Sequence, residues 1–333
     1  MPSIRFTADI SLCPLRLDIY ASTVQNISRS RLKTGLRLIS VNGKAAKLSL
    51  RLKGGEEVFI EWEDPLPEFI EPQNIPLDIL FENEDVTVVN KAQGMVTHPG
   101  AGNRSATLVN ALLYHWGSAE KLGEAAFRTG IVHRLDKDTS GVLIAAKNRE
   151  AEVFLQTEFK KRRVKKEYIA IVQGHPPSLY GEIKNHIARS PSNRKKFAVS
   201  KNPETGKSAY TVYRCIGIYG PYSLMRIQIK TGRTHQIRVH MKHLGCPVLG
   251  DPLYGKKDAL FTDASLMLHA RRLGIRLPYI KTEENSGALK TGKRDLQTFK
   301  APVPLRFKKV LKTLHTEFEA TVLPENTEKV LYD

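Results

Sequence analysis

The fold of this chain is indicated most directly by the stretch GIVHRLDKDTSGVLIAA, residues 130–146. Its first part is a loop that gathers histidine, basic, acidic and hydroxyl side chains. Its second part, residues 142–146, is an apolar run typical of a buried strand. A turn rarely contains so many groups able to act as acids, bases or anion ligands, so the loop is a candidate functional site. The alternative is structural, with Asp136 or Asp138 capping the turn through its carboxylate.

The charge balance around this loop is strongly basic, because 52 Lys and Arg residues stand against 34 Asp and Glu residues, a net charge of +18 over 333 residues. Such an excess points first to nucleic acid and second to an anionic membrane surface. The longest apolar runs resemble residues 141–146, far short of the roughly 20 residues that a membrane span needs. Residues 1–20 show no secretory signal pattern. We therefore expect a cytoplasmic protein without membrane contact.

The domain organisation follows from length and proline content. At roughly 150 residues per domain, the length predicts two domains or one large one. Four prolines interrupt an acidic stretch between residues 64 and 76, which is typical of an extended linker. We predict a small domain at 1–64, a linker at 65–76, a large domain at 77–315 and a C-terminal tail at 316–333.

The small domain contains a basic segment. Residues 29–53 carry eight basic side chains and no acidic one, which indicates an anion-binding face. The pattern predicts a helix after a Ser28 cap, a strand at 38–41, and turns at 42–43 and 54–55. The alternative is a basic surface that only faces solvent. The candidate RNA-binding residues are Arg29, Arg31, Lys33 and Arg37.

The large domain mixes helical and extended patterns. Asn148 and Thr234 are expected to cap helices, and Gly245 to end the second. Six of the seven side chains at 160–166 are basic, and we expect this run to line an RNA path. The predicted elements are strands at 86–89, 168–172 and 225–229, and helices at 108–113, 148–159 and 234–244.

Several motifs together resemble one known family. His133-Arg134-Leu135-Asp136, followed by Thr139-Ser140-Gly141, is similar to the signature loop of the RluA-type pseudouridine synthases, which isomerise uridine in ribosomal and transfer RNA. The resemblance spans roughly residues 70–315. The other blocks that resemble the family, in chain order, are Asn90-Lys91, Lys166-Glu167-Tyr168, residues 232–240, residues 250–255, Leu268-His269-Ala270 and residues 299–302.

The resemblance implies an α+β fold, with a catalytic domain built on a mixed, mostly antiparallel sheet and a small α/β N-terminal domain. It implies that Asp136 is the catalytic carboxylate, that Arg238 keeps it ionised, and that Tyr168 stacks on the target base. Arg134 would fill the space left by the flipped uridine. Taken alone, Arg238 would more often bind phosphate, and Tyr168 would more often be a core tyrosine.

The implied reaction gains and loses no atoms, so we expect no cofactor and no metal. The expected partner is RNA, with ribosomal RNA ahead of transfer RNA, and we expect a monomer. The small domain is similar to the RNA-binding domain named after ribosomal protein S-four. The blocks that carry this similarity are Arg16-Leu17-Asp18, Ser28-Arg29-Ser30, Val41-Asn42-Gly43 and residues 52–56.

Other functions fit the sequence less well. His235, His240 and His243 suggest a metal site, but no cysteine or carboxylate stands at ligand spacing, and the cysteines form no CxxC pair. A nucleotide-cradling enzyme would need a GxxxxGK loop, which the sequence lacks. An RNA-binding assembly factor without catalysis would show the same charge pattern, but it would be free to lose Asp136.

Overall fold

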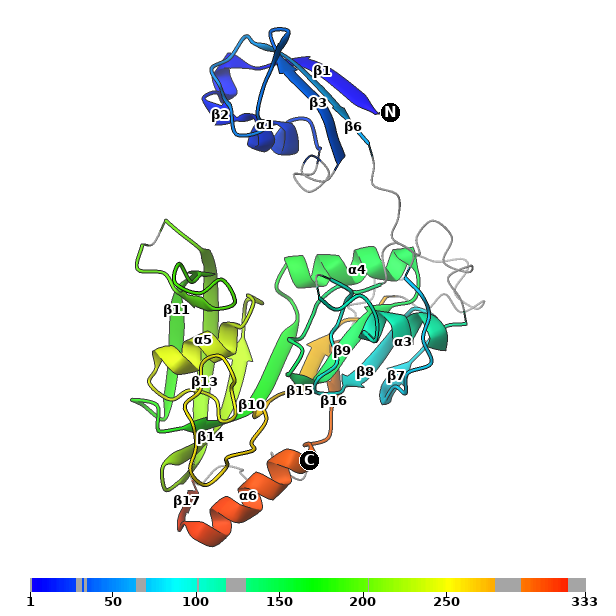
Figure 1. Ribbon diagram of the computed structural model, residues 1–333. Coiled ribbons are helices and arrows are strands. Elements are labelled where there is room, and N and C mark those ends of the chain that lie inside the picture. The colour runs from blue at the N-terminus through cyan, green and yellow to red at the C-terminus, as the bar shows by residue number, and fades with distance from the viewer. Residues whose placement is uncertain are drawn as a thin grey trace. The chain divides into compact units, whose positions relative to one another are not determined.

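The computed structural model describes residues 2–27, 32, 35–63, 70–100, 102–117, 130–202, 204–278 and 295–322 (Figure 1). The chain divides into two compact units, Met1–Phe69 and Ile70–Asp333. None of the described helices is both long and apolar enough to cross a membrane.

The N-terminal unit is a small sheet beside one described α-helix. Its strands β1 (Ser3–Thr7), β6 (Glu57–Trp62), β3 (Leu36–Val41) and β4 (Lys44–Ala45) pair antiparallel in that order. Strands β2 (Leu15–Arg16) and β5 (Arg51–Leu52) form a separate pair, and η1 (Ile10–Leu12) and α1 (Leu17–Thr23) complete the described elements.

Local turn chemistry explains the hairpin of this unit. Asn42 and Gly43 join β3 to β4 with φ of 50° and 72°, a backbone region that asparagine and glycine tolerate best. The helix predicted after Ser28 lies outside the described residues, as do Arg29, Arg31 and Lys33.

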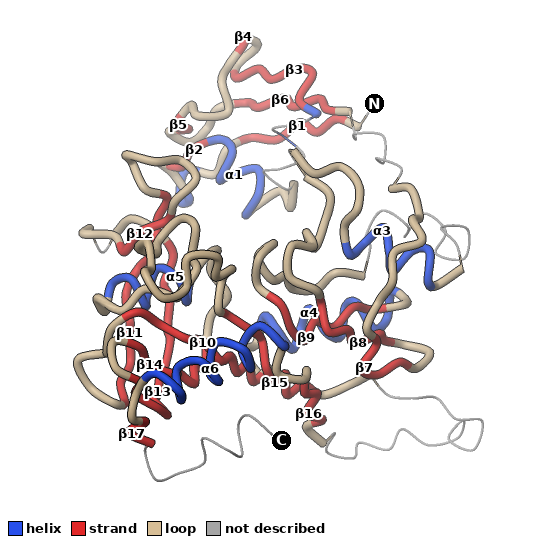
Figure 2. The backbone as a smooth tube through the Cα atoms, turned by 60° about the horizontal axis from the view of Figure 1, so that its bottom comes forward, coloured by secondary structure: helices blue, strands red, loops and turns tan. Residues whose placement is uncertain are grey.

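The large unit is built on one 11-stranded sheet, shown from end to end in Figure 2. Every pairing among its described strands is antiparallel except that of β9 with β15, which confirms the mixed, mostly antiparallel α+β prediction. The strand order is β12 (Phe197–Val199), β11 (Tyr180–Arg189), β13 (Lys207–Tyr219), β14 (Tyr222–Ile229), β10 (Lys165–Gln173), β15 (Leu268–Ile275), β9 (Ser140–Ala146), β8 (Val86–Lys91) and β7 (Ile79–Glu82), with β16 (Gln297–Lys300) on β15 and β17 (Ala320–Val322) on β13.

Four described helices accompany this sheet. They are α3 (Leu108–His115), α4 (Arg149–Lys160), α5 (Gln236–His243) and α6 (Leu305–Glu317). Helix α4 lies near β9, and α5 lies near β12 and β13, at the other half of the sheet (Figure 1).

Strand β9 is buried on both faces, which explains its uninterrupted apolar run. Leu143 and Ala145 belong to the larger core cluster, whereas Val142 and Ile144 pack in a second cluster with Leu155 of α4.

The parallel contact of β9 with β15 needs a glycine. At Gly141 the φ is 120°, and a Cβ would lie 2.2 Å from the carbonyl oxygen of Ala270. This close approach brings the loop before β9 to the middle of the sheet.

Most predicted elements of the large unit are confirmed, including the Asn148 cap, whose side chain accepts a hydrogen bond from the N–H of Ala151. The Thr234 cap is wrong. Helix α5 begins at Gln236, after His235 in a left-handed conformation with φ of 56°. Gln236 sets this start through tertiary contacts, because its Oε1 accepts from Thr231 and Arg233 and its Nε2 donates to strand β13.

Candidate active site

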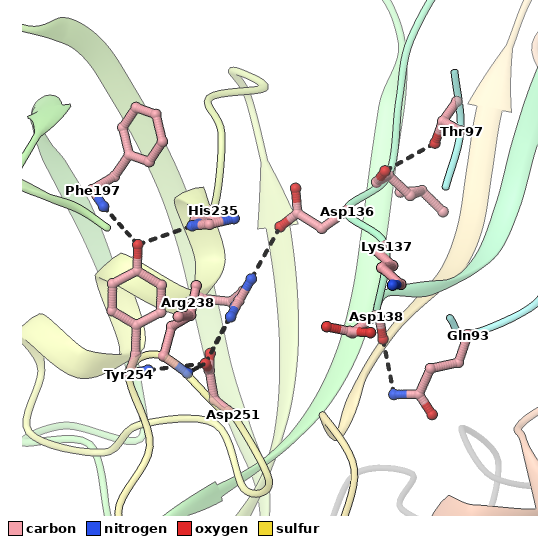
Figure 3. A network of polar contacts seen from close by, with 12 residues as sticks. Gln93, Thr97, Asp136, Lys137, Asp138, Phe197, His235, Arg238, Asp251 and Tyr254 are labelled. Carbon is pink, nitrogen blue, oxygen red and sulfur yellow. Dashed lines mark hydrogen bonds and ion pairs between the residues drawn. The ribbon is translucent and has the colours of Figure 1, made fainter. Parts of the chain in front are cut away.

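Three elements bring the predicted catalytic residues to one cavity. Asp136 comes from the loop before β9, Tyr168 from β10 and Arg238 from α5, and all three line the same cavity together with Arg134. The nearest atoms of the Asp136 carboxylate and the Arg238 guanidinium are 3.7 Å apart (Figure 3). The Asp136 side chain is 21% exposed, so a charged group faces the cavity while remaining open to a ligand.

The main partner of Arg238 is a carboxylate that the sequence analysis did not single out. Arg238 donates from Nε and Nη2 to the two oxygens of Asp251, both at 2.7 Å. The expectation that Arg238 grips Asp136 in the same way is wrong. Asp136 lies beside an arginine whose fork is already occupied, because a guanidinium can offer only one bidentate edge to each carboxylate.

The ion pair between Arg238 and Asp251 is buried and fully charged. Burial raises the pKa of the Asp251 carboxyl, but hydrogen bonds and charge attraction from Arg238 outweigh it and hold that pKa below its usual value. Burial likewise lowers the pKa of Arg238, and Asp251 reverses the effect, so that the pKa is raised. Asp251 also accepts hydrogen bonds from the N–H groups of Leu253 and Tyr254.

The backbone around Asp136 is held by donors from the segment after β8. Thr97 Oγ1 donates to the carbonyl of Leu135 at 2.9 Å, and Gln93 Nε2 donates to that of Asp138 at 2.9 Å (Figure 3). The carbonyl of Lys137 accepts from Lys91 Nζ and from the N–H of Gly94, and that of Asp136 from the N–H of Thr139. We call this set of contacts to residues 135–138 the carbonyl clamp.

Lys91 anchors the clamp from inside the protein. Its side chain is buried, and Nζ also donates to the carbonyls of Ala92 and Met95 at 2.8 and 2.7 Å. Burial lowers the pKa of Lys91 to about 8, although the charges of Asp136 and Asp138 oppose the shift. Its motif was quoted in the sequence, but this role depends on three-dimensional contacts that no local pattern shows.

Tyr168 is a buried side chain, 7% exposed, at the border between the core and the cavity. Burial raises the pKa of its hydroxyl, and the charge of Asp136 adds to the effect. Tyr168 is therefore a neutral phenol, able to present a ring face and a hydrogen-bond donor but no negative charge.

The predicted RNA-binding residues fall into two groups. Arg134 is exposed at the rim of the cavity, where a substrate would reach it. In the N-terminal unit, Arg37 is exposed and paired with Glu63, an acid that lies beyond the acid-free segment.

The histidines noted as metal candidates have structural partners. Among the described residues, no group of three His, Cys, Asp or Glu side chains could hold a metal. His240 is buried, with Nδ1 2.8 Å from Thr211 Oγ1 and Nε2 3.0 Å from Asn185 Oδ1. Burial lowers the pKa of His240 to about 4, with a smaller contribution from the charge of His243.

We expect His240 to make the protein less stable in acid. Its pKa is about 4 in the folded state and about 6.5 in the unfolded chain, so the unfolded state binds more protons between these values. The free energy of unfolding therefore falls as pH decreases through this window, by up to about 1.4 kcal/mol per pH unit for this group. Urea unfolding at pH 7 and pH 5 should show a weaker pH dependence for His240→Gln, whereas exposed His243→Gln should match wild type. Equal pH dependence in His240→Gln and wild type would contradict this assignment.

Comparisons with known proteins agree with this site. Residues 85–243 match the family described as RNA pseudouridylate synthase. A Borreliella burgdorferi protein named ribosomal large subunit pseudouridine synthase D is 40% identical over 329 residues, which cover 96% of this chain and 95% of the relative. The chain belongs to the RNA pseudouridylate synthase family. It is thus an RNA pseudouridine synthase, an isomerase, and the resemblance to the RluA-type enzymes is confirmed.

Further relatives of this synthase support the assignment. A Zymomonas mobilis protein of the same name is 42% identical over 291 residues, covering 84% of this chain and 91% of the relative. The structure of human RNA pseudouridylate synthase domain containing 1 is 26% identical, with a TM-score of 0.51, and covers 73% of this synthase and 96% of the human chain.

Proposed function

We propose that this synthase isomerises uridine in large-subunit ribosomal RNA, with Asp136 as the catalytic carboxylate. The observation that carries the proposal is the partly exposed Asp136, 3.7 Å from an arginine whose charge is secured by a second, buried carboxylate. Two curated relatives carry names that refer to the large ribosomal subunit, which supports that choice of RNA.

The reaction assigns a task to each residue of the cavity. It breaks the bond between ribose C1′ and uracil N1, turns the uracil and joins C1′ to C5, while N1 gains a proton and C5 loses one. Asp136 assists the cleavage, as an ionised carboxylate can. Arg238 favours its charged form by proximity. Tyr168 offers a ring face to the detached base and, as a neutral phenol, an O–H group near C5.

Access to the cavity requires base flipping. A uridine in folded RNA must leave its stack, which costs a few kcal/mol. We assign Arg134 to the vacated space, because it is exposed at the cavity rim and carries a planar group that can replace a stacked base.

The direct test uses unmodified large-subunit ribosomal RNA transcribed in vitro. After incubation with the protein, pseudouridine mapping should show conversion at discrete positions, and the Asp136→Asn protein should give none. Transfer RNA is treated in parallel. Conversion of transfer RNA alone would reject the proposed substrate and keep the reaction.

We further propose that the N-terminal unit resembling the S-four-type domain supplies RNA affinity and no chemistry. A shortened protein beginning at Glu71 should still isomerise a short RNA at low salt, because the cavity lies within the large unit. If the lost unit made Z phosphate contacts, the slope of log affinity against log salt should become shallower by about 0.7Z.

Structured RNA should be affected more than the short substrate, because shape-reading domains need folded RNA. Circular dichroism first establishes that the shortened protein is folded. A folded protein that binds and modifies long RNA as well as the full chain does would show that the N-terminal unit has no such role.

A further inference from the structure

A second cavity, of about 530 Å³, adjoins the catalytic one. The two share residues 232–234, the turn that precedes α5. The other walls of the second cavity come from the end of β11, from Phe197 of β12 and from Gly206-Lys207 at the start of β13. We call it the flanking cavity.

The charges of the flanking cavity have one sign. Arg189, Lys207 and Arg233 line it, and no acidic residue does. Arg189 and Lys207 are exposed, and Arg233 is fixed because its Nε donates to the carbonyl of Ser208 at 2.8 Å. Such a set suits an anion that enters from solvent, as a backbone phosphate would.

The flanking cavity also presents flat side chains. Phe197 is half-buried, and the guanidinium of Arg189 lies 5.1 Å from the centre of its ring. Arg189 itself is restrained because it donates to the carbonyl of Arg194 at 2.6 Å. Stacking on aromatic rings and arginine planes is the sequence-tolerant way in which proteins hold unpaired bases.

A hydrogen-bond chain joins the two cavities (Figure 3). The N–H of Phe197 donates to Tyr254 Oη at 2.7 Å, and Tyr254 Oη lies 3.0 Å from Nδ1 of His235, which lines the catalytic cavity. The backbone N–H of Tyr254 also donates to Asp251, the partner of Arg238. The wall of the flanking cavity is therefore built into the support of the catalytic one.

From these observations we propose that the flanking cavity binds the nucleotide next to the target uridine, with its base against Phe197 and Arg189 and its phosphate near Arg233 and Lys207. The inference rests on the proposed function, since a flipped uridine stays covalently joined to neighbours that must lie beside the catalytic cavity. Only one of the two neighbours can occupy it.

The test is a cycle between protein and RNA changes. The RNA is a stem-loop containing a uridine that the synthase converts, made with an abasic ribose on the 5′ side or on the 3′ side of that uridine. Dissociation constants are measured in Asp136→Asn protein, so that the RNA stays unchanged. One abasic RNA should bind roughly 5- to 100-fold more weakly than the intact RNA, and Phe197→Leu should remove most of that difference.

Matched variants separate stacking from packing and charge. Phe197→Tyr should keep the sensitivity, because its ring remains. Removing either exposed cation, Arg189→Gln or Lys207→Gln, should make the salt slope shallower by about 0.7 for each phosphate contact. Lys309→Gln, an exposed residue on α6, should leave the slope as in wild type.

The outcomes are distinguishable. If both abasic RNAs bind as well as the intact one, or if Phe197→Leu is as sensitive as Phe197, the flanking cavity does not hold a base. Turnover is scored separately with Asp136 present. Absence of isomerisation in any ribosomal RNA sequence would instead reject the proposed substrate, whatever the binding cycle shows.

Discussion

Asp136→Asn is expected to abolish isomerisation while RNA binding changes by no more than a few-fold. The amide keeps the size and shape of the side chain but removes the negative charge and the nucleophile. The carbonyl clamp acts on the backbone, so the loop keeps its position in the variant. Single-turnover pseudouridine formation and a binding isotherm on the same RNA give the two readouts.

Asp138→Asn is the matched control for this prediction. It removes a carboxylate from the same loop, two residues further on, and leaves Asp136 beside Arg238. It should retain most of the turnover. Substantial activity in Asp136→Asn, or an equal loss in both variants, would show that the reaction does not depend on this particular carboxylate.

Arg238→Ala is expected to lower both the stability and the activity of the protein. The side chain of Asp251 has no solvent exposure, and removing its partner leaves a buried charge unpaired, which typically costs about 3–5 kcal/mol. Arg238→Lys should recover little, because an ammonium cannot reproduce two parallel hydrogen bonds to one carboxylate. Urea unfolding of the two variants measures the effect.

The double variant Arg238→Ala/Asp251→Ala shows where the cost arises. Removing the second charge should restore part of the lost stability, whereas activity should stay low because Asp136 still lacks its neighbouring cation. If Arg238→Ala loses less than about 1 kcal/mol, the pair does not carry the buried charge that its geometry indicates.

Local patterns predicted those parts of the fold whose cause is local. The two-sided burial of β9 appears in the sequence as an apolar run, and the Asn148 cap as an asparagine before a helix. Helix α5 was placed correctly but given the wrong start, because Gln236 fixes it through contacts with strand β13.

The candidate site was predicted through residue types and a family resemblance, and its geometry was not. Asp136, Tyr168 and Arg238 do line one cavity. The pairing of Arg238 with Asp251 joins residues 13 positions apart across a turn. It competes with Asp136 for the same guanidinium, and a one-dimensional pattern contains no information on which carboxylate wins. The role of Lys91 escaped for the same reason, since its acceptors are backbone carbonyls.

The carbonyl clamp separates two demands that an RNA-modifying enzyme must meet. Ordering the backbone of one residue costs roughly 1–2 kcal/mol of conformational entropy, and for residues 135–138 this happens during folding, before RNA arrives. The substrate therefore does not have to organise the reactive loop. Lineages of such enzymes can change the hairpin between Arg189 and Lys207, and with it their choice of RNA, while the reactive carboxylate keeps its aim.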